Sequence, residues 1–117
     1  MDHNVEINFR SLVKKLEVKF GEGLELDTII LLIGVQELGM GYKDFSKDEK
    51  MNLMHIAICT ILEPYGVYKY VSTDDEGWPH FEKVKNIPAI SNSDQEHLLK
   101  EAVINYFEIN KYVTVEN

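Results

Sequence analysis

This sequence is poor in cysteine and in long apolar runs. Its single cysteine, Cys59, excludes a disulfide within the chain and favours a reducing compartment. The longest unbroken apolar run, residues 29–33, falls far short of the roughly 20 residues that span a bilayer. The first residues, MDHNVEINF, contain no basic segment followed by an apolar one. We therefore expect a cytoplasmic protein that has no membrane partner.

Basic side chains are also scarce. The chain has 12 Lys and Arg against 20 Asp and Glu, which gives a net charge of −8. Because the phosphate backbones of DNA and RNA are anionic, such a surface disfavours binding to nucleic acid. An acidic surface is typical of a soluble protein, and an acidic face for a basic partner is the alternative interpretation.

The segment from Ser46 to Pro64 is the part around which the chain is organised. Ser46 followed by Glu49 is a capping box, which predicts the start of a helix. Pro64 has no N–H to donate and predicts that this helix ends near Glu63. A helix with apolar residues around most of its circumference is buried on more than one side, by its own domain or by a second subunit. Its main apolar face comprises Met51, Met54, Ala57, Ile58, Ile61 and Leu62, with Leu53 and Ile56 on its far flank.

Helical spacing of apolar residues predicts three further helices. They cover residues 4–20, 27–38 and 93–110, and the last begins with a capping box at Ser93 and Glu96. The residues from 28 to 35 also fit a buried strand, since so short an apolar run does not distinguish the two structures. A glycine within this second helix, Gly34, marks the close approach of another helix.

Residues 67–84 predict a β-hairpin. VYKYVS alternates β-branched and aromatic residues as strands do, TDDEG is a polar turn, and WPHFEKV returns as the partner strand. A hairpin alone is marginally stable in water, so it has to pack on the helices.

With 117 residues, 44% of them hydrophobic, the chain suits one domain, residues 1–117. The fold class is therefore mainly α (α+β), a four-helix core with a β-hairpin between the third and fourth helices.

Two residues of the central helix are candidate metal ligands. His55 and Cys59 are four residues apart, so their side chains lie one above the other on the helix surface. Such a nitrogen and sulfur pair binds zinc when further ligands arrive, and His80 and Asp74 are the nearest suppliers. The alternative is a hydrogen-bonded structural histidine.

The segment TDDEGWPHF is a candidate ligand site. Trp78 and His80 beside the acidic residues suit a pocket for a polar or cationic ligand, since an indole ring attracts cations. In the alternative interpretation the acids solvate a turn and Trp78 fills the core.

Gln36 and Glu37 follow an apolar helix and are expected to be partly buried. A buried carboxylate has a raised pKa and is a candidate general base. The alternative is that Glu37 caps a backbone group or pairs with Lys43 or Lys50. No catalytic set is recognisable, and no cofactor is implied.

Three segments carry a resemblance to a known family. IGVQELG, DEKMNLMHIA and DEGWPH, all within residues 33–82, resemble a family of small bacterial proteins of uncharacterised function. The resemblance implies a cytoplasmic bacterial protein with a helical core, and it implies no reaction. It directs attention to five positions: Gln36, Glu37, His55, Trp78 and His80.

Two functions from different classes remain open. The favoured one is a non-enzymatic interaction or regulatory module, a homodimer that buries the excess apolar surface of the second and third helices. The alternative is a small-molecule or metal-binding protein, or an enzyme, whose site contains Glu37, His55, Cys59 and residues 74–80.

Overall fold

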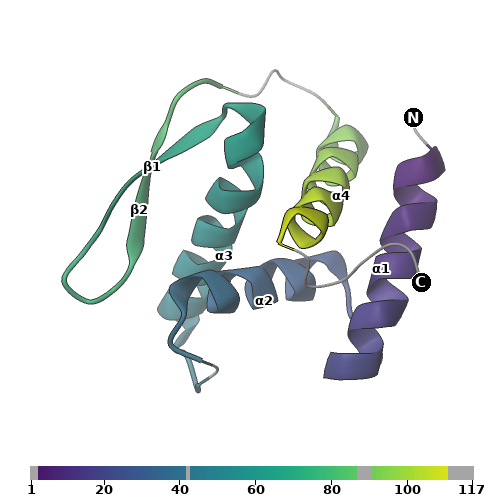
Figure 1. The fold of residues 1–117 in the computed structure, drawn as a ribbon, viewed down its shortest axis with the longest axis horizontal. Helices are drawn as coiled ribbons and strands as arrows, with labels where there is room; N and C mark the ends of the chain where they lie inside the picture. Colours follow the sequence, from purple (N-terminus) through teal and green to yellow (C-terminus); the bar gives the residue numbers. More distant parts are fainter. Residues whose placement is uncertain (1–2, 42, 87–90, 111–117) are drawn as a thin grey trace. The chain divides into compact units, whose positions relative to one another are not determined.

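The computed structural model describes residues 3–41, 43–86 and 91–110, which form four helices and one β-hairpin (Figure 1). This confirms the fold class expected from the sequence, with the hairpin between the third and fourth helices. It also shows that residues 28–35, for which a strand was the alternative, are helical. The elements are α1 (His3–Phe20), α2 (Leu26–Leu38), α3 (Lys47–Leu62), the short 3-10 helix η1 (Glu63–Tyr65), β1 (Tyr68–Thr73), β2 (Pro79–Lys83) and α4 (Asn92–Ile109).

The chain forms two compact units. The first contains α1 and α4 and draws on residues 1–26 and 89–117. The second, residues 27–88, contains nearly all of α2 together with α3 and the hairpin. The second unit is thus one continuous stretch of chain, and in the sequence it lies between the two helices of the first unit. That the chain is one domain stays a prediction.

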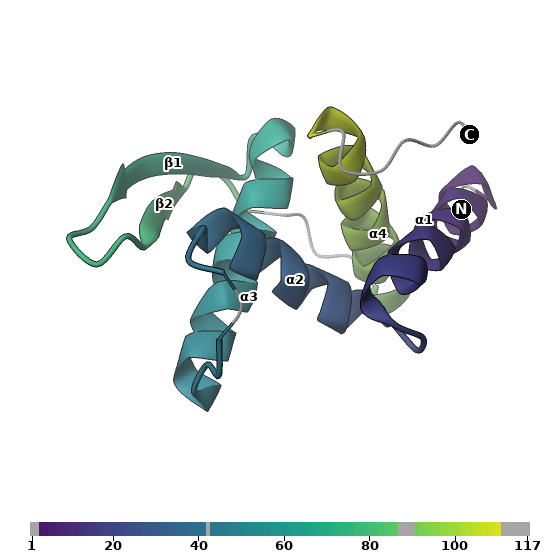
Figure 2. The same cartoon turned by 60° about the horizontal axis from the view of Figure 1, so that its bottom comes forward.

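In the second unit, α2 crosses α3 at Gly34 (Figures 1 and 2). A Cβ atom added to Gly34 would lie 2.8 Å from the carbonyl carbon of Leu53, a distance that real Cβ atoms do not adopt. Only glycine therefore lets the two backbones approach so closely, as its position within an apolar helix indicated. The buried apolar side chains of α2 and α3 include Ile29, Ile30, Ile33, Leu38, Leu53, Ile56 and Ala57.

The buried side of α3 differs from the expected one. Leu53, placed on the flank by the sequence, is 0% exposed, whereas Met51, placed on the main apolar face, is 63% exposed. The reason is that α2 packs against α3 at Leu53. Apolar residues surround most of this helix, so their spacing did not indicate on which side its neighbour lies.

The hairpin pairs β1 with β2 in antiparallel register, with Tyr70 opposite Phe81 and an irregularity just beyond Tyr70. These two rings meet edge to face, with centroids 5.8 Å apart. On the outer edge of β1 the N–H of Tyr70 donates to a carboxylate oxygen of Glu63, 3.2 Å away. Pro79, at the start of β2, has no N–H to offer. The edges of this hairpin therefore present fewer unpaired backbone N–H groups than the edges of a two-stranded sheet without these features.

Side-chain caps begin two of the helices. At α3 the N–H of Glu49 donates to Ser46 Oγ, and the N–H of Ser46 donates to Glu49 Oε1, as the predicted capping box requires. The cap of α4 is Ser91, whose Oγ accepts from the N–H of Asp94 at 3.1 Å. The prediction of Ser93 was therefore wrong. Two serines stand at this helix start, and Ser91 has the extended backbone that an N-cap needs.

In the first unit, α1 and α4 lie side by side and run in the same direction. Lys100 Nζ bonds Glu6 Oε1 at 3.0 Å and lies 5.2 Å from the ring centroid of Phe9. Further along both helices, Leu12 and Ile104 line one small cavity. The buried apolar residues of the pair are Val5, Phe9, Leu12 and Leu16 from α1 and Ala102, Val103, Ile104, Tyr106 and Phe107 from α4.

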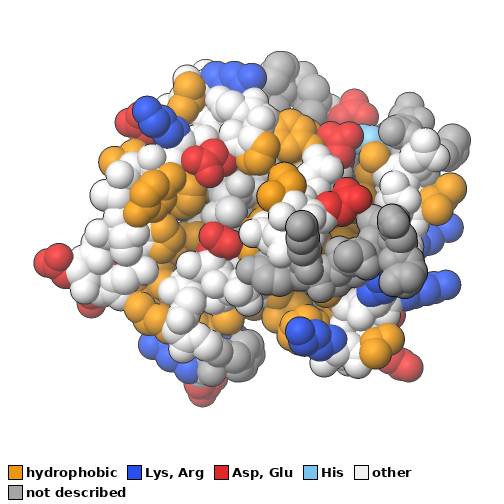
Figure 3. Space-filling model, in the orientation of Figure 1, with side chains coloured by type: hydrophobic (Ala, Val, Ile, Leu, Met, Phe, Trp, Pro, Cys, Tyr) orange, Lys and Arg blue, Asp and Glu red, His pale blue; other side chains and the backbone are white. Residues whose placement is uncertain are grey.

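Charged side chains of both signs are interspersed over the face drawn in Figure 3. None of the helices, over the described residues, has the length and apolar character needed to cross a bilayer.

Candidate functional site

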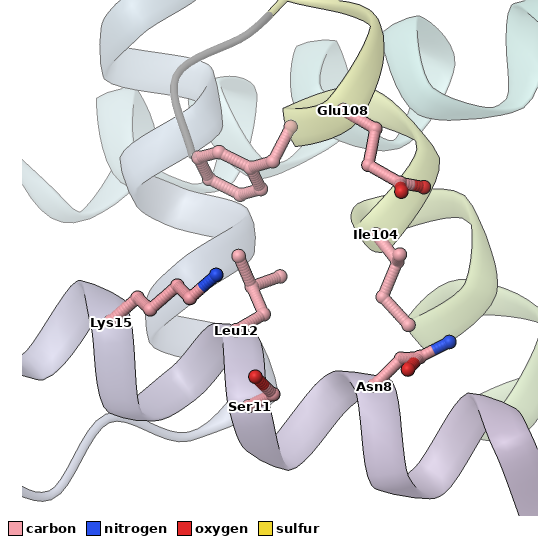
Figure 4. Close-up of a pocket in the computed structure, with 7 residues that line it drawn as sticks. Asn8, Ser11, Leu12, Lys15, Ile104 and Glu108 are labelled. Carbon is pink, nitrogen blue, oxygen red and sulfur yellow. The ribbon is translucent and has the colours of Figure 1, made fainter. Parts of the chain in front are cut away.

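Two concave features of the described residues are candidate sites. The first lies between α1 and α4, where side chains from both helices surround it (Figure 4). Its volume is about 10 Å³, close to the room that one water molecule needs. The second has a volume of about 280 Å³ and lies between α3 and the turn of the hairpin. We call it the hairpin hollow, and its lining residues are Asn52, His55, Ile56, Asp74, Glu76, Trp78, Pro79 and His80.

Asp74 shapes the turn that forms one wall of the hairpin hollow. Its Oδ1 accepts the N–H groups of Glu76 and Trp78, both at 2.9 Å. Its own N–H donates to the carbonyl of Trp78, and the N–H of Gly77 donates to the carbonyl of Asp74. Gly77 has a φ of +89°, which favours glycine at this position. The acidic turn therefore has a local structure that directs the chain back as β2.

The second oxygen of the Asp74 carboxylate binds His80. The distance from Oδ2 to His80 Nε2 is 2.9 Å. This hydrogen bond, followed by those from the backbone of Trp78 and Glu76, holds the pKa of Asp74 below its usual value. An ionised carboxylate only accepts hydrogen bonds, so Nε2 of His80 carries the proton that it donates. This bond orients the imidazole ring at the hollow.

Trp78 serves both the hairpin hollow and the core. It packs against a cluster of three buried side chains, Leu38, Phe45 and Leu53, and it also lines the hollow. The two interpretations of this residue, core and pocket, are thus compatible. Because Trp78 is the single tryptophan of the chain, its fluorescence and its indole N–H report on the hollow without interference.

Four of the predicted site residues line the hairpin hollow: His55, Asp74, Trp78 and His80. Gln36 and Glu37 do not line it, and both are exposed, contrary to the expected partial burial. The reason is that α2 turns its other sides, including Gly34 and Leu38, inward.

The sequence-based prediction missed Asn52 and Ile56, whereas Glu76 and Pro79 were included only as part of the segment 74–80. Of the two missed residues, Asn52 was the easier to find. It precedes His55 by three residues on α3, a spacing that puts both on one side of a helix.

Cys59 lies outside the hairpin hollow. It is fully buried, and burial raises the pKa of its thiol to about 11, so the thiol stays protonated at neutral pH. Its Sγ lies 3.5 Å from His55 Nε2, while Asp74 binds His80, so the four predicted metal ligands form two pairs. Within residues 3–41, 43–86 and 91–110, no three His, Cys, Asp or Glu side chains gather as a metal-binding group. Metal binding stays a prediction.

No family model, curated protein or solved structure matches this chain. The comparisons therefore add nothing to the resemblance seen in the sequence, and a bacterial source stays a prediction.

Proposed function

We propose that this protein is a non-enzymatic interaction module and that the hairpin hollow is its binding site. The supporting observation is that His55, Asp74, Trp78 and His80 line one concave feature. An aromatic side chain with a few convergent polar groups is the usual composition of a ligand site. The ordered turn and the packed Trp78 give this site a preformed wall, which lowers the entropy lost on binding.

The hairpin hollow is better suited to binding than to covalent catalysis. Its described lining includes no Ser, Thr, Cys or Lys side chain, which are the nucleophiles that a neighbouring base or a lowered pKa activates. Cys59 is buried and protonated, so it does not take that role either. The pair of Asp74 and His80 supports an alternative, a small-molecule-binding enzyme with His80 as general base.

The indole N–H signal of Trp78 in a two-dimensional NMR spectrum tests this proposal. We expect small cationic, anionic and neutral polar fragments, added at millimolar concentration, to include at least one class that shifts this signal saturably. Asn52→Tyr, which fills the hollow from α3, should abolish the shift. Lys50→Tyr, on the same helix outside the lining, should keep it. If no fragment class shifts the signal, the hollow is not a binding site.

We further propose that the protein is a cytoplasmic homodimer. The apolar residues of α2 and α3 are largely buried within the chain, so the interface has to use the apolar side chains that are exposed, of which Met51 lies on α3. Native mass spectrometry should give twice the mass of one chain, and a single-chain mass at micromolar concentration would contradict the dimer. Among the described residues, the large exposed apolar side chains are Ile7, Val18, Phe20, Met40, Met51, Tyr70, Val71, Val84 and Ile109.

A further inference from the structure

We propose that the hairpin hollow takes the arginine or lysine side chain of a partner protein, presented on a segment with apolar neighbours. This inference rests on the proposed function and names the partner of that same site. It follows from the size of the hollow, the charge of its lining and the apolar side chains beside it.

The size of the hairpin hollow suits one long side chain. Its volume of about 280 Å³ lies just below the roughly 300–1,000 Å³ of pockets that hold small molecules. It also opens to the surface, since the side chain of His80 is 58% exposed. An inserted side chain would therefore fit into it while the partner backbone stays outside.

The charge of the lining favours a cation. Asp74 and Glu76 contribute two carboxylates, and the described lining contains no Lys or Arg. Trp78 adds an indole ring, which attracts ammonium and guanidinium groups. Arg fits such a site well because its planar fork bonds carboxylates and stacks on aromatic rings. The net charge of −8 also steers a basic partner toward the protein.

Two exposed methionines indicate a protein segment rather than a free small cation. The terminal methyl of Met40 lies beside the turn, 2.7 Å from where a Cβ on Gly77 would be. Met51 precedes His55 by one helical turn on α3. They are 48% and 63% exposed, so apolar surface flanks the polar hollow. Methionine adapts to varied partners, and apolar residues beside an inserted Arg or Lys would cover these two.

The fluorescence of Trp78 allows a direct test with blocked tripeptides. We expect acetyl-Leu-Arg-Leu-amide to change the emission saturably and to bind at least about tenfold more tightly than its citrulline analogue, which is nearly the same shape but uncharged. Equal affinity for the two peptides would overturn the role of charge. Equal affinity for acetyl-arginine-amide would indicate a free cation instead of a protein segment.

Two charge-matched variants locate the contact. Glu76→Gln and Asp75→Asn each remove one negative charge from the same turn, but only Glu76 lines the hollow. We expect Glu76→Gln to weaken binding of the arginine peptide about tenfold, and Asp75→Asn to change it less than about twofold. Equal losses would show general attraction and overturn the inference.

The two proposals fail in different ways. If anionic or neutral fragments shift the indole signal of Trp78 while the arginine peptide does not bind, the hollow is a binding site and only the inferred partner is wrong. If no ligand shifts the signal, both proposals are wrong.

Discussion

Replacing Gly34 by alanine should lower the free energy of unfolding by about 2 kcal/mol. The new Cβ would lie 2.8 Å from the carbonyl carbon of Leu53, and the main chain yields less easily than a flexible side chain. Because the contact is with the main chain, we expect overpacking at the upper end of the usual range, about 3 kcal/mol, whereas the better helix propensity of alanine returns about 1 kcal/mol. Urea unfolding followed by the fluorescence of Trp78 measures the difference.

Thr28→Ala is the matched control for this prediction. Thr28 lies on the same helix, is exposed, and gains the same kind of helix propensity without approaching α3. We expect this variant to be as stable as the original protein or slightly more so. If Gly34→Ala also keeps full stability, α2 and α3 do not cross as closely as described.

Replacing Leu53 by alanine should lower the free energy of unfolding by about 3 kcal/mol, within the range measured when buried leucines are truncated. Leu53 is 0% exposed, approaches Gly34 at the helix crossing, and belongs to the cluster on which Trp78 packs. The cavity left behind also removes a neighbour of the indole ring. The emission of Trp78 should therefore move to longer wavelength in the folded variant. A single urea unfolding series followed by this fluorescence measures both the wavelength and the stability.

Met51→Ala provides the contrast. Met51 is two residues away on α3 and 63% exposed, so its truncation should change stability by less than about 0.5 kcal/mol. The sequence alone favoured the opposite ranking of these two residues. A larger loss at Met51 than at Leu53 would contradict the structure and support the ranking from the sequence.

The parts of the fold that depend on neighbouring residues could be predicted from the sequence. Ser46 and Glu49 cap α3 through bonds that span only three residues, and Pro64 ends the helix by lacking an N–H. The turn before Trp78 is also local, because Asp74 bonds the backbone within four residues. Such bonds form wherever these residues occur in this order.

The features that depend on distant residues were harder to predict. The burial of Leu53 follows from α2, which packs on one side of a helix that is apolar almost all round. Gln36 and Glu37 were expected to be partly buried because they follow apolar residues, yet they lie on the outward side of α2. Asn52 joins the hairpin hollow because the hairpin folds over α3. The spacing of Asn52 and His55 puts both on one side of α3, but it does not indicate that the hairpin covers that side.

The parallel pairing of α1 with α4 has a consequence for synthesis of the chain. The helix made first pairs with one that starts about 70 residues after it ends, which takes a ribosome roughly 4–14 seconds to add. During this interval Val5, Phe9, Leu12 and Leu16 have no α4 to cover them. Residues 27–88 are contiguous and can fold meanwhile. We therefore expect a ribosome-associated chaperone to bind nascent α1. The chain is most prone to aggregate during this interval, which ends when α4 emerges.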